Sequence, residues 1–101
     1  MEVNLRALRA RAPEHPAAAR FGDVARWLTG RSDASAEEGI GWVADLRRAL
    51  RVPGLSAYGL TAADVPALIE KAKAASSMRG NPIALTDAEL TEIAERAMAA
   101  A

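Results

Sequence analysis

The chain has 101 residues, half of them apolar, and its 13 basic side chains balance 13 acidic ones. This length predicts one domain, and zero net charge argues against nucleic acid as the main partner, because phosphate binding needs a surplus of basic residues. The absence of cysteine from the sequence excludes disulfides and thiolate metal ligands. No apolar run approaches the roughly 20 residues that span a bilayer. We therefore expect a soluble cytoplasmic protein that binds neither nucleic acid nor membrane.

The first part of the chain has the apolar spacing of two helices. Leu5 and Leu8 among arginines predict a short amphipathic helix over residues 3–11. Pro16 suits the first turn of a second helix, where its missing N–H is not needed, and Gly30 is typical of a helix end. The expected buried stripe of the second helix consists of Phe21, Val24, Ala25 and Leu28.

A third helix is predicted after Ser35. Serine followed three residues later by glutamate, here Glu38, is the signature of a capping box. The helix should end before Pro53, because the residue before a proline avoids helical backbone. Its expected buried stripe consists of Ile40, Val43, Leu46 and Leu50. The two tryptophans, Trp27 and Trp42, are expected in the core or at an interface.

The fourth helix has a start signal that conflicts with a proline. Thr61 to Asp64 reads T-A-A-D, a capping signature, but Pro66 lies too deep for an undisturbed helix that starts at Thr61. A short turn over residues 62–64, with the main helix beginning near Val65, removes the conflict. Its expected buried face consists of Val65, Leu68, Ile69 and Ala72.

The segment from Ser76 to Leu90 reads SSMRGNPIALTDAEL and is more than a plain turn. Gly80, Asn81 and Pro82 follow one another, so we expect a conformationally demanding loop. Thr86 to Glu89 is a third capping signal, and it starts the last helix. That helix should bury Leu90, Ile93, Ala94, Ala97 and Met98, and the alanines after it should fray.

The period is helical throughout, which predicts an all-α fold with about five helices in a single domain over residues 1–101. No catalytic constellation stands out. The one histidine, His15, is expected in an exposed turn. The paired carboxylates, Glu37 with Glu38 and Glu89 with Glu92, lie near predicted helix starts, where the helix dipole favours negative charge. From composition and residue spacing alone, we expect the chain to be a binding or scaffold module.

Three segments of the sequence, read together, carry a resemblance to a known protein family. They are MEVNLRAL at 1–8, VPGLSAYGLTAADVPALIEKA at 52–72 and SSMRGNPIALTDAELTEI at 76–93. Together they resemble the C-terminal helical region of the iron-containing (group III) alcohol dehydrogenases. The family's G-x-x-x-x-D-x-P-x-L pattern is filled by Gly59, Asp64, Pro66 and Leu68. Its later N-P loop and threonine- or serine-led helix are matched by Asn81, Pro82 and Thr86.

The resemblance implies the C-terminal part of the dehydroquinate synthase-like fold and a longer parent enzyme. In that parent an N-terminal α/β domain binds NAD or NADP, and an aspartate and three histidines in the helical domain bind iron, or zinc in some members. The metal polarises the alcohol oxygen as a Lewis acid. The family's ligand histidines precede the segment matched by Met1 and Asn4, and His15 matches no ligand position. We therefore expect no catalytic, cofactor-binding or metal-binding residue in this chain.

One part of the parent's site is carried over by the resemblance. The loop before the last helix would form a wall of the substrate cleft, with Ser77, Met78, Gly80, Asn81 and Pro82 as wall residues. The alternative is a loop that only connects two helices and buries Ile83 and Leu85.

Two main function hypotheses follow. In the first, the chain is a C-terminal fragment of such a dehydrogenase, inactive alone, which self-associates or binds a chain that carries the missing domain. Leu5, Leu8 and Trp27 are candidates for its exposed apolar surface. In the second, it is an independent helical interaction module or one chain of a split dehydrogenase. A self-sufficient enzyme is a third possibility, for which no catalytic constellation is visible.

Overall fold

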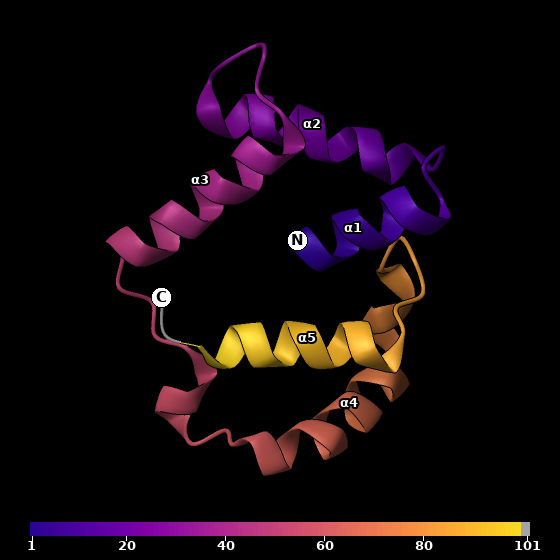
Figure 1. Ribbon diagram of the computed structural model, residues 1–101, viewed down its shortest axis with the longest axis vertical. Helices are drawn as coiled ribbons and strands as arrows, with labels where there is room; N and C mark the ends of the chain where they lie inside the picture. The colour runs from indigo at the N-terminus through magenta and orange to yellow at the C-terminus, as the bar shows by residue number, and fades with distance from the viewer. Residues whose placement is uncertain (100–101) are drawn as a thin grey trace. The chain divides into compact units, whose positions relative to one another are not determined.

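The segments whose apolar residues have helical spacing form helices in the structure. The computed structural model describes residues 1–99, and that range holds five α-helices, three short 3₁₀ helices and no strand (Figure 1). The all-α prediction is thus confirmed. The α-helices are α1 (Glu2–Arg11), α2 (Pro16–Thr29), α3 (Ala36–Ala49), α4 (Val65–Ala74) and α5 (Asp87–Met98). The prediction that the alanines after Met98 fray concerns in part residues 100 and 101, which lie outside the described range.

The helices group into two units. The first unit, Met1–Val52, contains α1, α2 and α3, and the second, Pro53–Ala101, contains α4, α5 and the three 3₁₀ helices η1 (Leu55–Tyr58), η2 (Ala62–Asp64) and η3 (Ser76–Gly80). The single domain over residues 1–101 and the likeness to the dehydroquinate synthase-like fold stay predictions.

In the first unit, α2 packs against α3 through small residues (Figure 1). Ala25 is fully buried, and a Cβ added at Gly39 would lie 2.6 Å from the Cβ of Ala25 and 2.7 Å from its Cα. Glycine is therefore required at this crossing, because a larger residue would push the two backbones apart. Ala36, one turn earlier in α3, is also buried.

This crossing explains why the predicted stripe of α3 is only half right. Ile40 and Val43 are half-buried, but Leu46 is 42 % exposed and Leu50 is 66 % exposed. The close contact lies in the first half of α3, so the second half of the helix turns its large apolar side chains toward solvent. The expectation that Leu46 and Leu50 belong to the core is wrong.

For α1, residues that were expected to be exposed are buried. Leu5 and Leu8 were candidates for an exposed apolar surface, yet they are 3 % and 0 % exposed. Val3 and Ala7 are buried as well, so the apolar face of α1 is wider than two leucines suggest. Of the three predicted surface candidates, only Trp27 is exposed, at 78 %.

The end of α3 lies before Pro53, as predicted. The helix ends at Ala49, and Arg51 follows with a left-handed backbone at φ 54°. The N–H of Val52 donates to the carbonyl of Arg47 at 3.1 Å. A hydrogen bond of this kind, between residues five positions apart, closes many helix ends. The residue with the left-handed backbone at such an end is usually glycine.

In the second unit, the start of α4 is as predicted. The turn η2 covers Ala62–Asp64 and α4 begins at Val65, with Pro66 in the first turn. The core of this unit consists of Val65, Ile69, Leu90 and Ala94, with Leu68, Met78, Leu85 and Met98 packed around it. Two helices thus meet here through branched side chains rather than through backbone.

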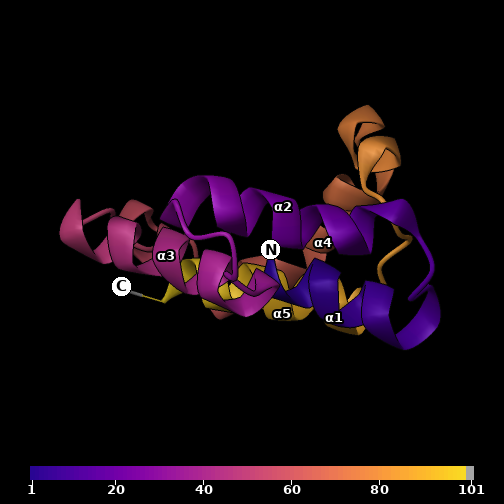
Figure 2. The same ribbon diagram turned by 90° about the horizontal axis from the view of Figure 1, so that it is seen from above.

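The segment between α4 and α5 is simpler than expected. It leaves the end of α4 as η3 and returns to the start of α5 (orange in Figure 2). Gly80 and Asn81 both keep negative φ, since within residues 1–99 the only glycines with positive φ are Gly30 and Gly59. The expectation of a demanding backbone is wrong, because a 3₁₀ turn followed by Pro82 changes the chain direction without left-handed residues.

Candidate functional site

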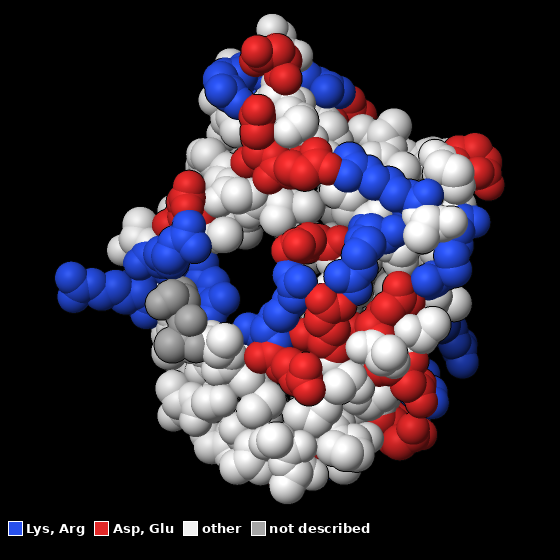
Figure 3. All heavy atoms as spheres, in the orientation of Figure 1, with Lys and Arg blue, Asp and Glu red and all other residues white. Residues whose placement is uncertain are grey.

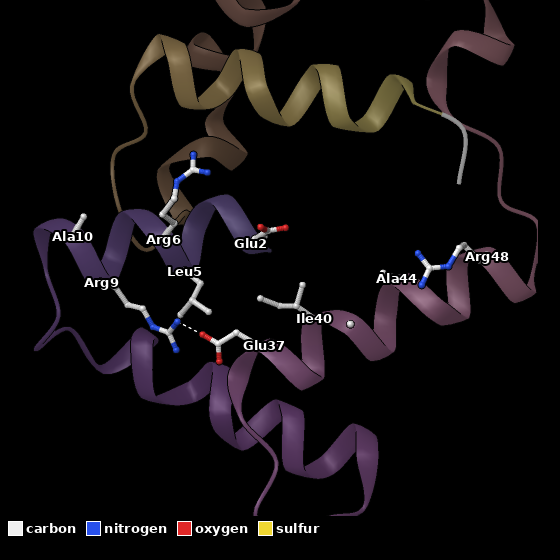
Figure 4. A pocket seen from close by; sticks show the side chains of 10 residues that line it. Glu2, Leu5, Arg6, Arg9, Ala10, Glu37, Ile40, Ala44 and Arg48 are labelled. Atoms are coloured by element: carbon white, nitrogen blue, oxygen red, sulfur yellow. Dashed lines mark hydrogen bonds and ion pairs between the residues drawn. The ribbon is translucent and has the colours of Figure 1, made fainter.

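One candidate site is a cleft in the first unit. A cavity of about 850 Å³ opens between α1 and α3 (Figure 4). Leu5 of α1 and Ile40 of α3 face each other across it, and the ion pair between Arg9 and Glu37 joins the two helices beside them. No pattern in the sequence predicts this cleft, because Arg9 and Glu37 are 28 positions apart and carry no spacing signal.

The charges in this cleft compensate one another. The hydrogen bond from Arg9 lowers the pKa of Glu37, and the same bond raises the pKa of Arg9. Arg48, at the far end of the cleft, pairs with Asp45. Glu37 is therefore held in its charged form, which leaves it without the near-neutral pKa that a general acid or base needs.

A second candidate site lies at the segment that the sequence singled out. A cavity of about 350 Å³ is lined by Met78, Asn81, Ile83, Ala84, Leu85 and Leu90, with Lys73 and Arg79 as its charged residues. Of the predicted wall residues, Met78 and Asn81 line this cavity. Ser77, Gly80 and Pro82 belong to the same segment but do not line it. Ile83 and Leu85 are half-buried, as the connecting-loop alternative expects.

Polar contacts fix the shape of this second cavity. The side-chain amide of Asn81 donates from Nδ2 to the carbonyl of Ile83 at 2.7 Å, which holds the turn. Lys73 Nζ lies 3.1 Å from Asp87 Oδ1 and 3.3 Å from Glu70 Oε1. The bond to Asp87, and then that to Glu70, raises the pKa of Lys73. Arg79 has no ion-pair partner within residues 1–99.

Several of the residues that carry the family resemblance have local structural roles. Gly59 has a left-handed backbone at φ 94° and ends η1, a conformation that glycine adopts without strain. The carboxylate of Asp64 accepts hydrogen bonds from the N–H and the hydroxyl of Thr61, both at 2.8 Å, and these bonds lower the pKa of Asp64. Thr86 forms a full capping box with Glu89. Helix initiation therefore accounts for much of the pattern.

His15 and Glu92 have local structural roles. Within residues 1–99, no three His, Cys, Asp or Glu side chains gather closely enough to hold a metal ion. His15 begins α2 instead, because its Nδ1 accepts a hydrogen bond from the N–H of Ala17 at 3.0 Å. This capping role was not predicted. Glu92 pairs with Arg96 at 2.8 Å.

Large apolar side chains are exposed in both units. In the first unit they include Trp27 and a stripe on α3 formed by Trp42, Leu46 and Leu50, which we call the α3 stripe; Trp42 is 38 % exposed. In the second unit, Leu55 and Tyr58 are exposed, and residues 53–69 contain a single charged residue, Asp64. Figure 3 shows a continuous uncharged area on this unit. Trp27 therefore does not belong to the core, and its expected role at an interface stays a prediction.

Comparisons with family models, with curated proteins and with solved structures find no match to this chain. Within residues 1–99, no helix is both long and apolar enough to cross a membrane.

Proposed function

We propose that this chain is the C-terminal helical part of an iron-type, NAD(P)-dependent alcohol dehydrogenase, and that it acts by packing against the parts that bind the nucleotide and the metal. The observation that carries the packing role is the α3 stripe together with Trp27. Several large apolar side chains exposed on the helices of a small protein indicate an interaction surface. The identity of the partner comes from the resemblance at residues 52–72 and 76–93.

In this proposal the chain supplies structure and one wall of a substrate cleft, not the reacting groups. The wall is the segment from Ser77 to Pro82, of which Met78 and Asn81 face the cavity of about 350 Å³. The bound nicotinamide and metal of the partner supply the hydride acceptor and the Lewis acid. The role of this chain is to exclude water and to position the substrate, which enzymes use to raise rates.

Reconstitution in trans tests the proposal. The chain is co-expressed with an iron-type alcohol dehydrogenase from which the matching C-terminal region has been removed. We expect the two chains to co-purify and to reduce NAD(P) in the presence of alcohol, while the chain alone does neither. Alcohol oxidation by the purified chain with stoichiometric metal would instead establish a self-sufficient enzyme.

A pair of matched variants links the result to the surface. Leu46→Asp places a charge within the α3 stripe, and we expect it to weaken co-purification by at least about tenfold, because a buried unpaired charge is costly at an interface. Ala19→Asp adds the same charge at an exposed position of α2 and should leave co-purification unchanged. Equal effects of both variants would contradict a role for the α3 stripe.

The second candidate function is an independent helical interaction module. The same exposed side chains favour it, since Trp27 and Tyr58 are 78 % and 74 % exposed and aromatic residues dominate binding energy at interfaces. Capture of partners from the source cell separates the two functions. A dehydrogenase-like partner supports the first proposal, and an unrelated partner supports the second.

A further inference from the structure

We propose that the cavity between η3 and the start of α5, which we call the loop cavity, binds a small organic carboxylate, with its apolar part inside and its carboxylate at Arg79. As a statement about the substrate of the enzyme, this inference rests on the proposed function. As a statement about binding to this chain, it stands on the cavity alone.

The size and the walls of the loop cavity define the body of the ligand. Its volume of about 350 Å³ is near the lower end of small-molecule sites, which span roughly 300–1,000 Å³. It corresponds to about a dozen water volumes, at about 30 Å³ each. Met78, Ile83, Leu85 and Leu90 form apolar walls, so burial of a short alkyl chain of about five carbons drives binding.

The charges define the head of the ligand. The residues that line the loop cavity include two cations, Lys73 and Arg79, and no carboxylate. Lys73 already pairs with Asp87 and Glu70, which neutralises it. Arg79 has no such partner within residues 1–99. One open guanidinium beside an apolar wall matches one carboxylate, because the planar fork of arginine binds both carboxylate oxygens at once.

Asn81 orients the site. Its Nδ2 donates to the carbonyl of Ile83 at 2.7 Å, so its amide is anchored to the turn rather than free to swing. The turn holds η3, and with it Arg79, at the rim of the cavity. The rim is therefore fixed by a hydrogen bond within the segment, and the ligand does not have to order it.

A titration of the full chain tests the inference. Hexanoate, hexanol and hexyl phosphate are added to ¹⁵N-labelled protein, and amide shifts are followed by NMR. We expect shifts at residues 73–90 with hexanoate at a dissociation constant on the order of millimolar. Hexanol should bind about fivefold more weakly, because it lacks the charge that Arg79 holds. Tighter binding of hexyl phosphate than of hexanoate would replace the carboxylate with a phosphate and overturn the proposed ligand class.

Two variants remove one positive charge each. Arg79→Gln should lower hexanoate affinity about fivefold and leave hexanol affinity unchanged. Lys71→Gln is the control, because Lys71 is an exposed cation of α4 that does not line the loop cavity; it should change either affinity by less than about twofold. Equal binding of hexanoate and hexanol to the native chain, or equal losses in both variants, would overturn the inference. Because no catalysis is measured, a failed reconstitution of the dehydrogenase leaves this result unaffected.

Discussion

The two units of this chain hold their helices together in different ways. In the first unit, α2 and α3 meet through Ala25 and Gly39, so the backbones approach closely but the contact buries little side-chain area. In the second unit, α4 and α5 meet through Val65, Ile69, Leu90 and Ala94. In the first unit the large apolar side chains of the two crossing helices, Trp27 and the α3 stripe, lie at the surface, whereas in the second unit Leu55 and Tyr58, which are exposed, belong to η1 and not to α4 or α5. Small residues at a crossing bring helices together and leave large apolar side chains of the same helices exposed.

A buried and an exposed leucine give the largest expected contrast. Leu90→Ala removes a side chain that is 6 % exposed in the core of the second unit and should cost about 3 kcal/mol of unfolding free energy. Leu50→Ala at the end of α3 should cost less than about 0.5 kcal/mol. Urea unfolding followed by circular dichroism measures both. Similar costs would show that Leu50 is buried in solution by self-association, which a dilution series would reveal.

The helix crossing of the first unit can be tested with two glycines. Gly39→Ala gains about 1 kcal/mol of helix propensity but loses more by overpacking against Ala25, so we expect a net cost of about 1–2 kcal/mol. A Cβ at Gly41 meets nothing within 4 Å, so Gly41→Ala should stabilise by about 1 kcal/mol. Thermal unfolding should move in opposite directions for these two variants of the same helix. A stabilised Gly39→Ala protein would disprove the close crossing.

The helix caps differ between the units as well. Thr86 has the reciprocal box, because its hydroxyl accepts from the N–H of Glu89 at 3.1 Å and its own N–H donates to the Glu89 carboxylate at 2.9 Å. Ser35 accepts from the N–H of Glu38 at 3.2 Å, while the Glu38 carboxylate pairs with Arg31. We expect Thr86→Ala to cost about 1 kcal/mol and Ser35→Ala somewhat less. Amide hydrogen exchange in the first turns of α3 and α5 reports each loss separately.

A smaller effect is expected at the end of α3. Arg51 holds a left-handed backbone at φ 54°, which costs a residue with a side chain about 1–2 kcal/mol. Glycine removes that cost but loses more backbone entropy on folding. Arg51→Gly should therefore stabilise the chain by about 0.5 kcal/mol, whereas Arg47→Gly, inside the helix, should destabilise it by about 1 kcal/mol. Chemical denaturation midpoints of the two variants test this order.

The last comparison concerns how low pH and salt affect one carboxylate in each unit. The pKa of Glu37 is lowered by its bond to Arg9, and that of Asp64 by its bonds to Thr61. Each carboxylate therefore adds stability above its unfolded pKa, and this stability is lost as pH falls through the lowered pKa of the folded state. Salt screens the ion pair of Glu37 more than the neutral donors at Asp64. High salt should therefore raise the pKa of Glu37 more than that of Asp64. NMR titration of the two carboxyl groups at low and high salt measures both changes.

Several features of the candidate sites were readable from the sequence, and others were not. The segment from Ser76 to Leu90 was singled out, and Met78 and Asn81 do line a cavity. Arg79 also lines that cavity, but the sequence did not predict this. An arginine in a turn has the same sequence pattern as any solvated cation. The cleft between α1 and α3 had no signal at all, since its walls come from residues far apart in the chain.

The sequence by itself determined where the helices begin, because a cap is made by atoms within three or four residues of one another. Pro16, Ser35, Thr86 and the turn before Val65 all start helices as predicted. It could not determine which apolar face becomes core. Leu5 and Leu50 have the same side chain and similar helical surroundings, yet one is buried and the other is exposed. Tertiary structure decided this, because burial depends on where two helices cross, and in the first unit that place is set by one glycine.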